Sequence, residues 1–205
     1  MSQSPRITSV VIVPARGHST ATGDYDRGHA AGNVSELDVI DMIVAPLEEM
    51  LSEYYVRFSV MPTRKHPGIA EDRRHEGIQE QTLVFEIALD WFSRPRLRNY
   101  SQVYYGSGGH AAKILSELMC DTLSEWGAIS CFGHRCSNPK ESTAPLLNIP
   151  NTVGIRVEPM ALNGPDVVDY MKRIRALGQD LAHCIIDFTA GSHSCSSKSV
   201  ITCSK

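Results

Sequence analysis

The segment from Val10 to Glu36 constrains the fold more than any other part of the sequence. It starts with four consecutive β-branched residues, Val10 to Val13, and continues through a polar loop that contains Gly, His and Asp. A buried strand that leads through a loop into a helix is the start of an α/β unit. In open α/β sheets, the chemistry gathers where the carboxyl ends of strands meet loops. His18 and Glu36, at the two ends of this loop, are therefore candidate site residues, and both residue types can bind a metal.

The rest of the chain continues the alternation of strands and helices. Ser35 is a suitable N-cap for an amphipathic helix over residues 36–53, which contains Pro46. Residues 131–150 hold several prolines and little periodicity, which predicts a loop. The alternation as a whole predicts an α/β fold with a mixed, mostly parallel sheet and helices on both faces. Further strands are predicted at 55–61, 83–89, 102–105 and 152–157, and further helices at 69–80, after Gly109 and at 168–184.

Length and composition suit a single domain. A chain of 205 residues with 42% hydrophobic residues can bury a core without disulfides or metals to support it. We predict one domain over residues 1–188 and a Ser-rich disordered tail over 189–205. The net charge of −3 does not favour a nucleic-acid partner. The Arg-rich run from Arg94 to Arg98 is interpreted as a solvated loop.

The N-terminal residues lack an apolar stretch, which predicts that the chain has no secretory signal. No apolar run approaches the ~20 residues that a membrane span needs. We therefore expect a cytoplasmic protein, or one released at lysis if it is phage-encoded. The six cysteines are expected to be reduced thiols. Cys131 and Cys136 flank His134, but no second ligand pair follows at zinc-finger spacing, so a loop is the better interpretation.

Several metal-binding or proton-transferring residue types fall at the carboxyl ends of predicted strands. They are His18, Asp90 and Glu158, with Glu36 at the start of the first helix. A histidine and several carboxylates are what a metal-assisted hydrolase needs, because the metal activates a water and a spare carboxylate moves the proton. His18 can also be a surface or capping residue, and Glu36 a first-turn carboxylate favoured by the helix dipole. An idle carboxylate at Glu158 would cost stability, which favours a functional role there.

The order of short motifs strengthens this interpretation. Gly17-His18 follows the first strand, Glu36 opens the first helix, and Val157-Glu158 ends the last strand. Between and after these come Thr63-Arg64, Arg73, Val103-Tyr104-Tyr105 and Ala161-Leu162-Asn163. In this order, from about Ile7 to Ile185, the chain resembles the zinc-dependent N-acetylmuramoyl-L-alanine amidases, which are α/β cell-wall hydrolases. The resemblance implies a peptidoglycan or muropeptide substrate and a Zn²⁺ cofactor. It also implies that His18 and Glu36 are metal ligands and that Glu158 is the catalytic base.

One position departs from the family. Its third metal ligand is a histidine in an Ile-His-Ala-Asn segment, which here reads Ile87-Ala88-Leu89-Asp90. Alanine cannot coordinate a metal, and a catalytic zinc normally has three protein ligands. Asp90 is our candidate replacement, because strand periodicity sets it on the same face as Ala88 and Glu86. Glu86 and His110 are alternatives.

Three functions remain open from the sequence. The first is a zinc-dependent amidase that cleaves the amide between glycan and stem peptide in peptidoglycan. The second is a degenerate amidase fold without zinc that acts as a binding module. The third is an amidohydrolase of small N-acyl amino acids, in which the Arg94–Arg98 loop would read a carboxylate.

Overall fold

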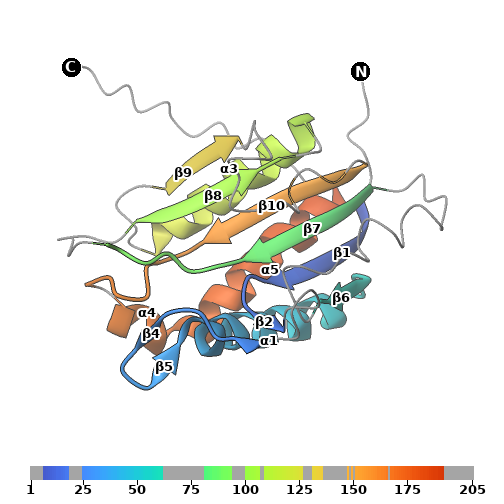
Figure 1. Ribbon diagram of the computed structural model, residues 1–205. Coiled ribbons are helices and arrows are strands. Elements are labelled where there is room, and N and C mark those ends of the chain that lie inside the picture. The colour runs from blue at the N-terminus through green and yellow to red at the C-terminus, as the bar shows by residue number, and fades with distance from the viewer. Residues whose placement is uncertain are drawn as a thin grey trace, which may run out of the picture.

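The computed structural model describes residues 7–18, 25–61, 81–93, 100–106, 109–126, 131–135, 147, 149, 151–165 and 167–191. Six strands form its main sheet, in the order β6-β1-β7-β10-β8-β9 (Figure 1). Their bounds in that order are Phe58–Val60, Ile7–Pro14, Gln81–Ile87, Thr152–Glu158, Ser101–Tyr105 and Cys131–Arg135.

Most neighbouring strands of this sheet run in parallel. β1 pairs in parallel with β6 and β7, β7 with β10, and β8 with β9. The exception is β8, which runs antiparallel to β10. The predicted mixed, mostly parallel sheet is thus confirmed. The carboxyl ends of β1, β7 and β10 meet at one edge, where the predicted site residues lie.

The three long helices of the described part are α1 (Glu36–Glu53), α3 (Gly109–Glu125) and α5 (Ile174–Ala190). They pack against one face of the sheet and against each other (Figure 1). α1 begins as the sequence predicted, because Ser35 and Asp38 form a capping box. Within the described residues, no helix is long and apolar enough to cross a membrane.

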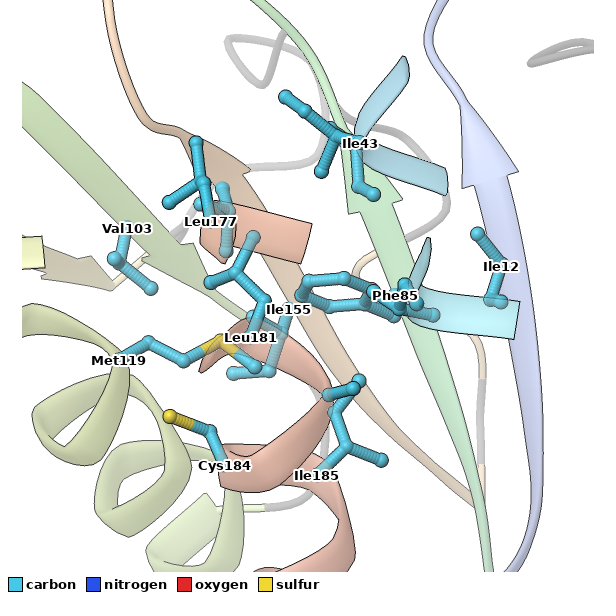
Figure 2. Packing of buried hydrophobic residues seen from close by; sticks show 14 of the residues in the cluster. Ile12, Ile43, Phe85, Val103, Met119, Ile155, Leu177, Leu181, Cys184 and Ile185 are labelled. Atoms are coloured by element: carbon cyan, nitrogen blue, oxygen red, sulfur yellow. The ribbon is translucent and has the colours of Figure 1, made fainter. Parts of the chain in front are cut away.

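The main core lies between these helices and the sheet. Phe85 of β7 is fully buried and lies among residues of β1, α1 and α5 (Figure 2). Phe85 and Ile87 face the helices, so strand alternation turns Glu86 to the opposite face of the sheet. The side chains of Arg156 and Glu158 on β10 share that opposite face, because Arg156 is the register partner of Glu86. This face therefore carries the polar residues of β7 and β10.

Two small hairpins connect β1 to α1. β2 (Gly17–His18) pairs with β3 (Tyr25–Asp26), and β4 (Ala30–Ala31) pairs with β5 (Val34–Ser35). The described residues of the polar loop expected after the first strand thus include two backbone-paired hairpins. The hairpins bring the segment around Asp26 and Gly28 over the first turn of α1.

Parts of the sequence prediction need correction. The loop predicted over 131–150 is wrong at its start, because β9 completes the sheet at Cys131–Arg135. The single helix predicted over 168–184 is two helices, α4 (Val167–Lys172) and α5. The strand predicted over 55–61 is shorter, and Tyr55 before it has a φ of 56°. The tail predicted over 189–205 starts too early, because α5 continues to Ala190. Outside the described residues lie the helix predicted at 69–80, the Arg94–Arg98 run, Thr63-Arg64, Arg73 and residues 192–205.

Candidate functional site

Glu36 is the first residue of α1, and its side chain is buried although it is charged. Only 3% of the side chain is exposed. Its Oε1 accepts a hydrogen bond from the backbone N–H of Leu89 at 3.3 Å, just beyond the end of β7. The positive end of the α1 dipole also favours a carboxylate in the first turn. Glu36 thus reaches the predicted edge of the sheet and is fixed there.

Arg16, in the loop after β1, contacts the other oxygen of the Glu36 carboxylate and neutralises its charge. Its Nε donates to Glu36 Oε2 at 2.9 Å, and its Nη1 donates to Asp26 Oδ2 at 3.0 Å. Asp26 is oriented by the Gly28 N–H, which donates to Oδ1 at 2.8 Å. This backbone hydrogen bond lowers the pKa of Asp26 below its usual value, burial opposes it, and the charge and hydrogen bond of Arg16 add to the lowering. Arg16 therefore bridges a buried and an exposed carboxylate.

His29 and Trp91 border the same carboxylate. The His29 ring stacks on the Trp91 ring with centroids 4.7 Å apart and planes 13° apart. His29 Nδ1 lies 3.8 Å from Glu36 Oε2, and 52% of the His29 side chain is exposed. The pair forms a flat aromatic wall beside Glu36, with a polar nitrogen directed at the carboxylate.

Asp90 lies just beyond β7, and its carboxylate is occupied by protein donors. The Trp91 N–H donates to Oδ1 at 2.7 Å, and the Tyr100 hydroxyl donates to Oδ2 at 2.6 Å. An isolated bridge between Asp90 and Ala161 extends the pairing of β7 with the β10 side. Asn163 braces this region, because its side-chain amide makes two 2.8 Å hydrogen bonds with the backbone of Phe92. These contacts give Asp90 a structural role in the loop.

Glu158 ends β10, where the sequence predicted a catalytic carboxylate. Arg156 Nε and Nη2 donate to its Oε1 at 2.8 and 2.5 Å. Arg156 Nη1 also donates to Glu86 Oε1 at 3.2 Å. Burial opposes the charge of Arg156, but the two glutamates outweigh it and raise the arginine's pKa. Glu158 is thus one member of a buried cluster of three charged residues, Arg156, Glu86 and Glu158.

A second polar chain reaches Glu158 from β8. The Tyr104 hydroxyl donates to Gln102 Oε1 at 2.7 Å, and Gln102 Nε2 lies 3.4 Å from Glu158 Oε2. Burial, and then the charge of Glu158, raise the pKa of Tyr104 well above its usual value. The phenol therefore stays protonated as a hydrogen-bond donor. Both oxygens of Glu158 consequently have protein donors.

The described residues do not fit a three-ligand zinc site. Ala88 is fully buried at the expected third ligand position, and its N–H donates to Val157 O at 3.0 Å. The Glu36 carboxylate accepts hydrogen bonds from Arg16 and Leu89, and the Asp90 carboxylate accepts them from Trp91 and Tyr100. Among the residues that the structure describes, no group of three His, Cys, Asp or Glu side chains could hold a metal ion. His18 pairs with Tyr25 through its backbone, and its side chain lies outside the described part. His110 is exposed at the start of α3.

An apolar cavity of about 470 Å³ lies between the β4–β5 hairpin and α4. Ala31 and Val34 of the hairpin before Glu36 form one wall, and Leu162 beyond Glu158 forms another. The short helix α4, which lies beside this hairpin in Figure 1, contributes Met171 and Lys172. The volume of the cavity is in the range of small-molecule sites, which are mostly apolar with few polar groups.

Sequence reasoning missed the arginine partners of both glutamates. Arg156 could have been found, because it stands two residues before Glu158 in a strand and so shares its face. Arg16 directly precedes Gly17-His18, but its contact with Glu36 depends on the path of the intervening loop. His29 has no motif around it and is exposed, yet it borders the site. The cavity beside α4 has no signature in the sequence.

No family model and no curated protein sequence matches the chain. Solved structures do. An N-acetylmuramoyl-L-alanine amidase from Clostridium difficile 630 matches with a TM-score of 0.68 and 16% identity, over 92% of this chain and 100% of that one. The amidase Ami1 from Mycobacterium smegmatis matches with a TM-score of 0.66 and 15% identity, over 93% and 100%. For Cwp6 from Clostridium difficile the TM-score is 0.66 at 16% identity, and 89% of this chain spans 29% of that protein. The chain therefore has the amidase fold, as its motif order predicted.

Proposed function

We propose that the chain binds peptidoglycan fragments at the edge of the sheet where β1, β7 and β10 end. The observation that carries the proposal is the apolar cavity lined by the β4–β5 hairpin, Leu162 and α4, within a fold shared with N-acetylmuramoyl-L-alanine amidases. A muropeptide carries small apolar groups, such as the acetyl and alanyl methyls, next to amide bonds. The apolar lining of the cavity suits the methyl groups, and Lys172, the one charged residue of the lining, suits a carboxylate.

Binding can be measured by calorimetry with soluble muropeptides and by co-sedimentation with purified sacculi. We expect the wild-type chain to bind, and Val34→Asp to weaken binding about tenfold or more, because it introduces a charge into the cavity. Met42→Asp is the matched control, since Met42 is exposed on α1, away from the cavity lining. Equal affinities for wild type and Val34→Asp, or no binding by the wild type, would overturn the proposal.

Amide hydrolysis is the second candidate function. It is favoured by the positions of Glu36 and Glu158, which match a metal ligand and a catalytic base in the resemblance drawn from the sequence. For hydrolysis, His18, Glu36 and a third residue such as Asp90 would hold Zn²⁺. The hydrogen bonds that Glu36 and Asp90 already accept from protein groups disfavour this metal site. Mass spectrometry of digested sacculi, with and without added ZnCl₂, separates the two functions. Peptide release that Glu158→Gln abolishes supports hydrolysis, whereas binding unchanged by Glu158→Gln without release supports a binding module.

Two further expectations accompany this proposal. Small N-acyl amino acids, tested beside muropeptides in the same assays, check the amidohydrolase alternative. The cytoplasmic location, or release at lysis for a phage-encoded protein, stays a prediction that cell fractionation would test.

A further inference from the structure

The guanidinium of Arg16 lies where the sequence led us to expect a metal cation. It contacts Glu36 Oε2 at 2.9 Å, while 25% of the Arg16 side chain remains exposed. A buried carboxylate is costly unless a positive charge and hydrogen bonds compensate it. Arg16 supplies the charge, and the Leu89 N–H supplies the hydrogen bond to the other oxygen. The charge of Glu36 is therefore balanced by the chain itself.

The backbone closes over this ion pair. Gly28 has a φ of +71°, and a Cβ built on it would lie 2.3 Å from Glu36 Oε2 and 2.8 Å from Arg16 Nε. Only a residue without a side chain permits this approach. The same Gly28 orients Asp26 through its N–H, and Asp26 holds the far end of the guanidinium. The loop thus clamps Arg16 from two sides, in a position fixed by its own backbone.

The position where the family has its third metal ligand is also changed. Ala88 is fully buried and offers only a methyl group. A cation-binding carboxylate with an arginine on one oxygen, and no ligand at the position of Ala88, lacks the donor set of a zinc site.

We infer that the Arg16 guanidinium takes the place of a metal ion at Glu36, so that this end of the site is held together without metal. The Arg16–Glu36 pair does in this chain what a bound cation would do: it neutralises a buried carboxylate at the start of α1. The inference does not depend on muropeptide binding, because its tests measure stability and metal response only.

The first test is a thermal-unfolding series on the full chain. Arg16→Ala should lower Tm by about 5 to 10 °C, since it leaves a buried carboxylate without its cation. Adding Glu36→Gln to Arg16→Ala should recover part of that loss, because the unpaired charge is then gone. Arg175→Ala is the matched control, since Arg175 forms an exposed pair with Glu49, and its Tm should change by less than about 2 °C. A loss for Arg16→Ala no larger than the control would overturn the inference.

The second test asks where zinc acts. In the wild type, we expect roughly 100 µM ZnCl₂ to cause no rise in Tm that the substitution Glu36→Gln abolishes. The variant Arg16→Ala/Ala88→His should gain a zinc-dependent rise in Tm, whereas Ala88→His alone should not, because Arg16 still occupies Glu36. A zinc-induced rise in the wild type that Glu36→Gln abolishes would overturn the inference. Because the test counts only a zinc effect that depends on Glu36, zinc bound elsewhere, such as at cysteines, does not change its outcome. If the histidine variants do not fold, the comparison of wild type with Glu36→Gln is sufficient.

Discussion

The two glutamates at the edge of the sheet are both paired with arginine, but in different ways. Glu36 meets Arg16, which comes from a loop, keeps 25% of its side chain exposed and shares its charge with the exposed Asp26. Glu158 meets Arg156, which comes from the same strand, is only 8% exposed and shares its charge with the fully buried Glu86. The first pair is thus partly accessible to water through Arg16, whereas the second pair is enclosed on one face of the sheet. The site therefore has one end that is partly open to water and one end that is buried.

The largest effect should come from breaking the enclosed pair. Arg156→Leu leaves Glu86 and Glu158 buried on one face without their cation, which should cost about 3–5 kcal/mol of unfolding free energy. Urea denaturation followed by circular dichroism measures the change. If the cluster stabilises only by neutralising charge, replacing Arg156, Glu86 and Glu158 together by leucine should restore most of the loss. A cost for Arg156→Leu below about 1 kcal/mol would mean that water reaches this cluster.

An intermediate effect should come from forcing apart the accessible pair. Gly28→Ala adds a Cβ against Glu36 and Arg16 at a positive φ, and should cost about 2–4 kcal/mol. Gly32 is the matched control: its φ is +63°, but nothing lies within 4 Å of its Cβ position. Gly32→Ala should therefore show the backbone cost alone, about 1 kcal/mol. Equal losses for the two variants, measured by urea denaturation, would mean that the loop yields easily around Arg16.

The smallest effect should be a pH dependence at the exposed end. The folded-state pKa of Asp26 is lowered from 3.8, mainly by the Gly28 N–H and with help from Arg16. Its contribution to stability should therefore be present above about pH 4 and be lost as the pH falls through the lowered pKa. The Tm difference between wild type and Asp26→Asn should be constant from about pH 5 to 7 and shrink below about pH 4.

Asp41 provides a control of opposite sign. Burial, and then the nearby Asp38, raise its pKa above 3.8. Its contribution is present below about pH 4 and lost as the pH rises through the raised pKa. As the pH rises through this pKa, the variant Asp41→Asn should therefore become more stable relative to the wild type. If both variants shift in the same direction, the acid response does not come from these two carboxylates.

The elements that could be predicted are those whose signals are local. α1 combined an N-cap, helical periodicity and a first-turn acid, and its bounds came out correctly from Ser35 onward. β9 was missed because its five residues show no alternation and it forms only by pairing with β8 at the sheet edge. α4 and α5 were merged because apolar spacing continues across the break at Arg173. Tertiary pairing, and not propensity, decides both cases.

The same division holds for the site. Glu36 and Glu158 were found because each stands at the boundary of a regular element. The Arg16–Glu36 contact joins residues 20 positions apart across two small hairpins, and no spacing rule relates them. The use of Asp90 as a loop brace was hidden for a similar reason, because its partner Tyr100 follows a segment without a pattern. The order of the motifs therefore identified the site residues, whereas the residues that contact them could be found only from the three-dimensional structure.

The order of the strands has a consequence for synthesis. β10 is the last of the described strands along the chain, yet it lies between β7 and β8 in the sheet. Until residue 158 has left the ribosome, β7 and β8 each present an open edge that could pair with another chain. A nascent chain shorter than this should be prone to aggregation, and the sheet should close slowly because its central contacts span about 70 residues. The strand that carries Glu158 is thus also the one that ends this vulnerable period.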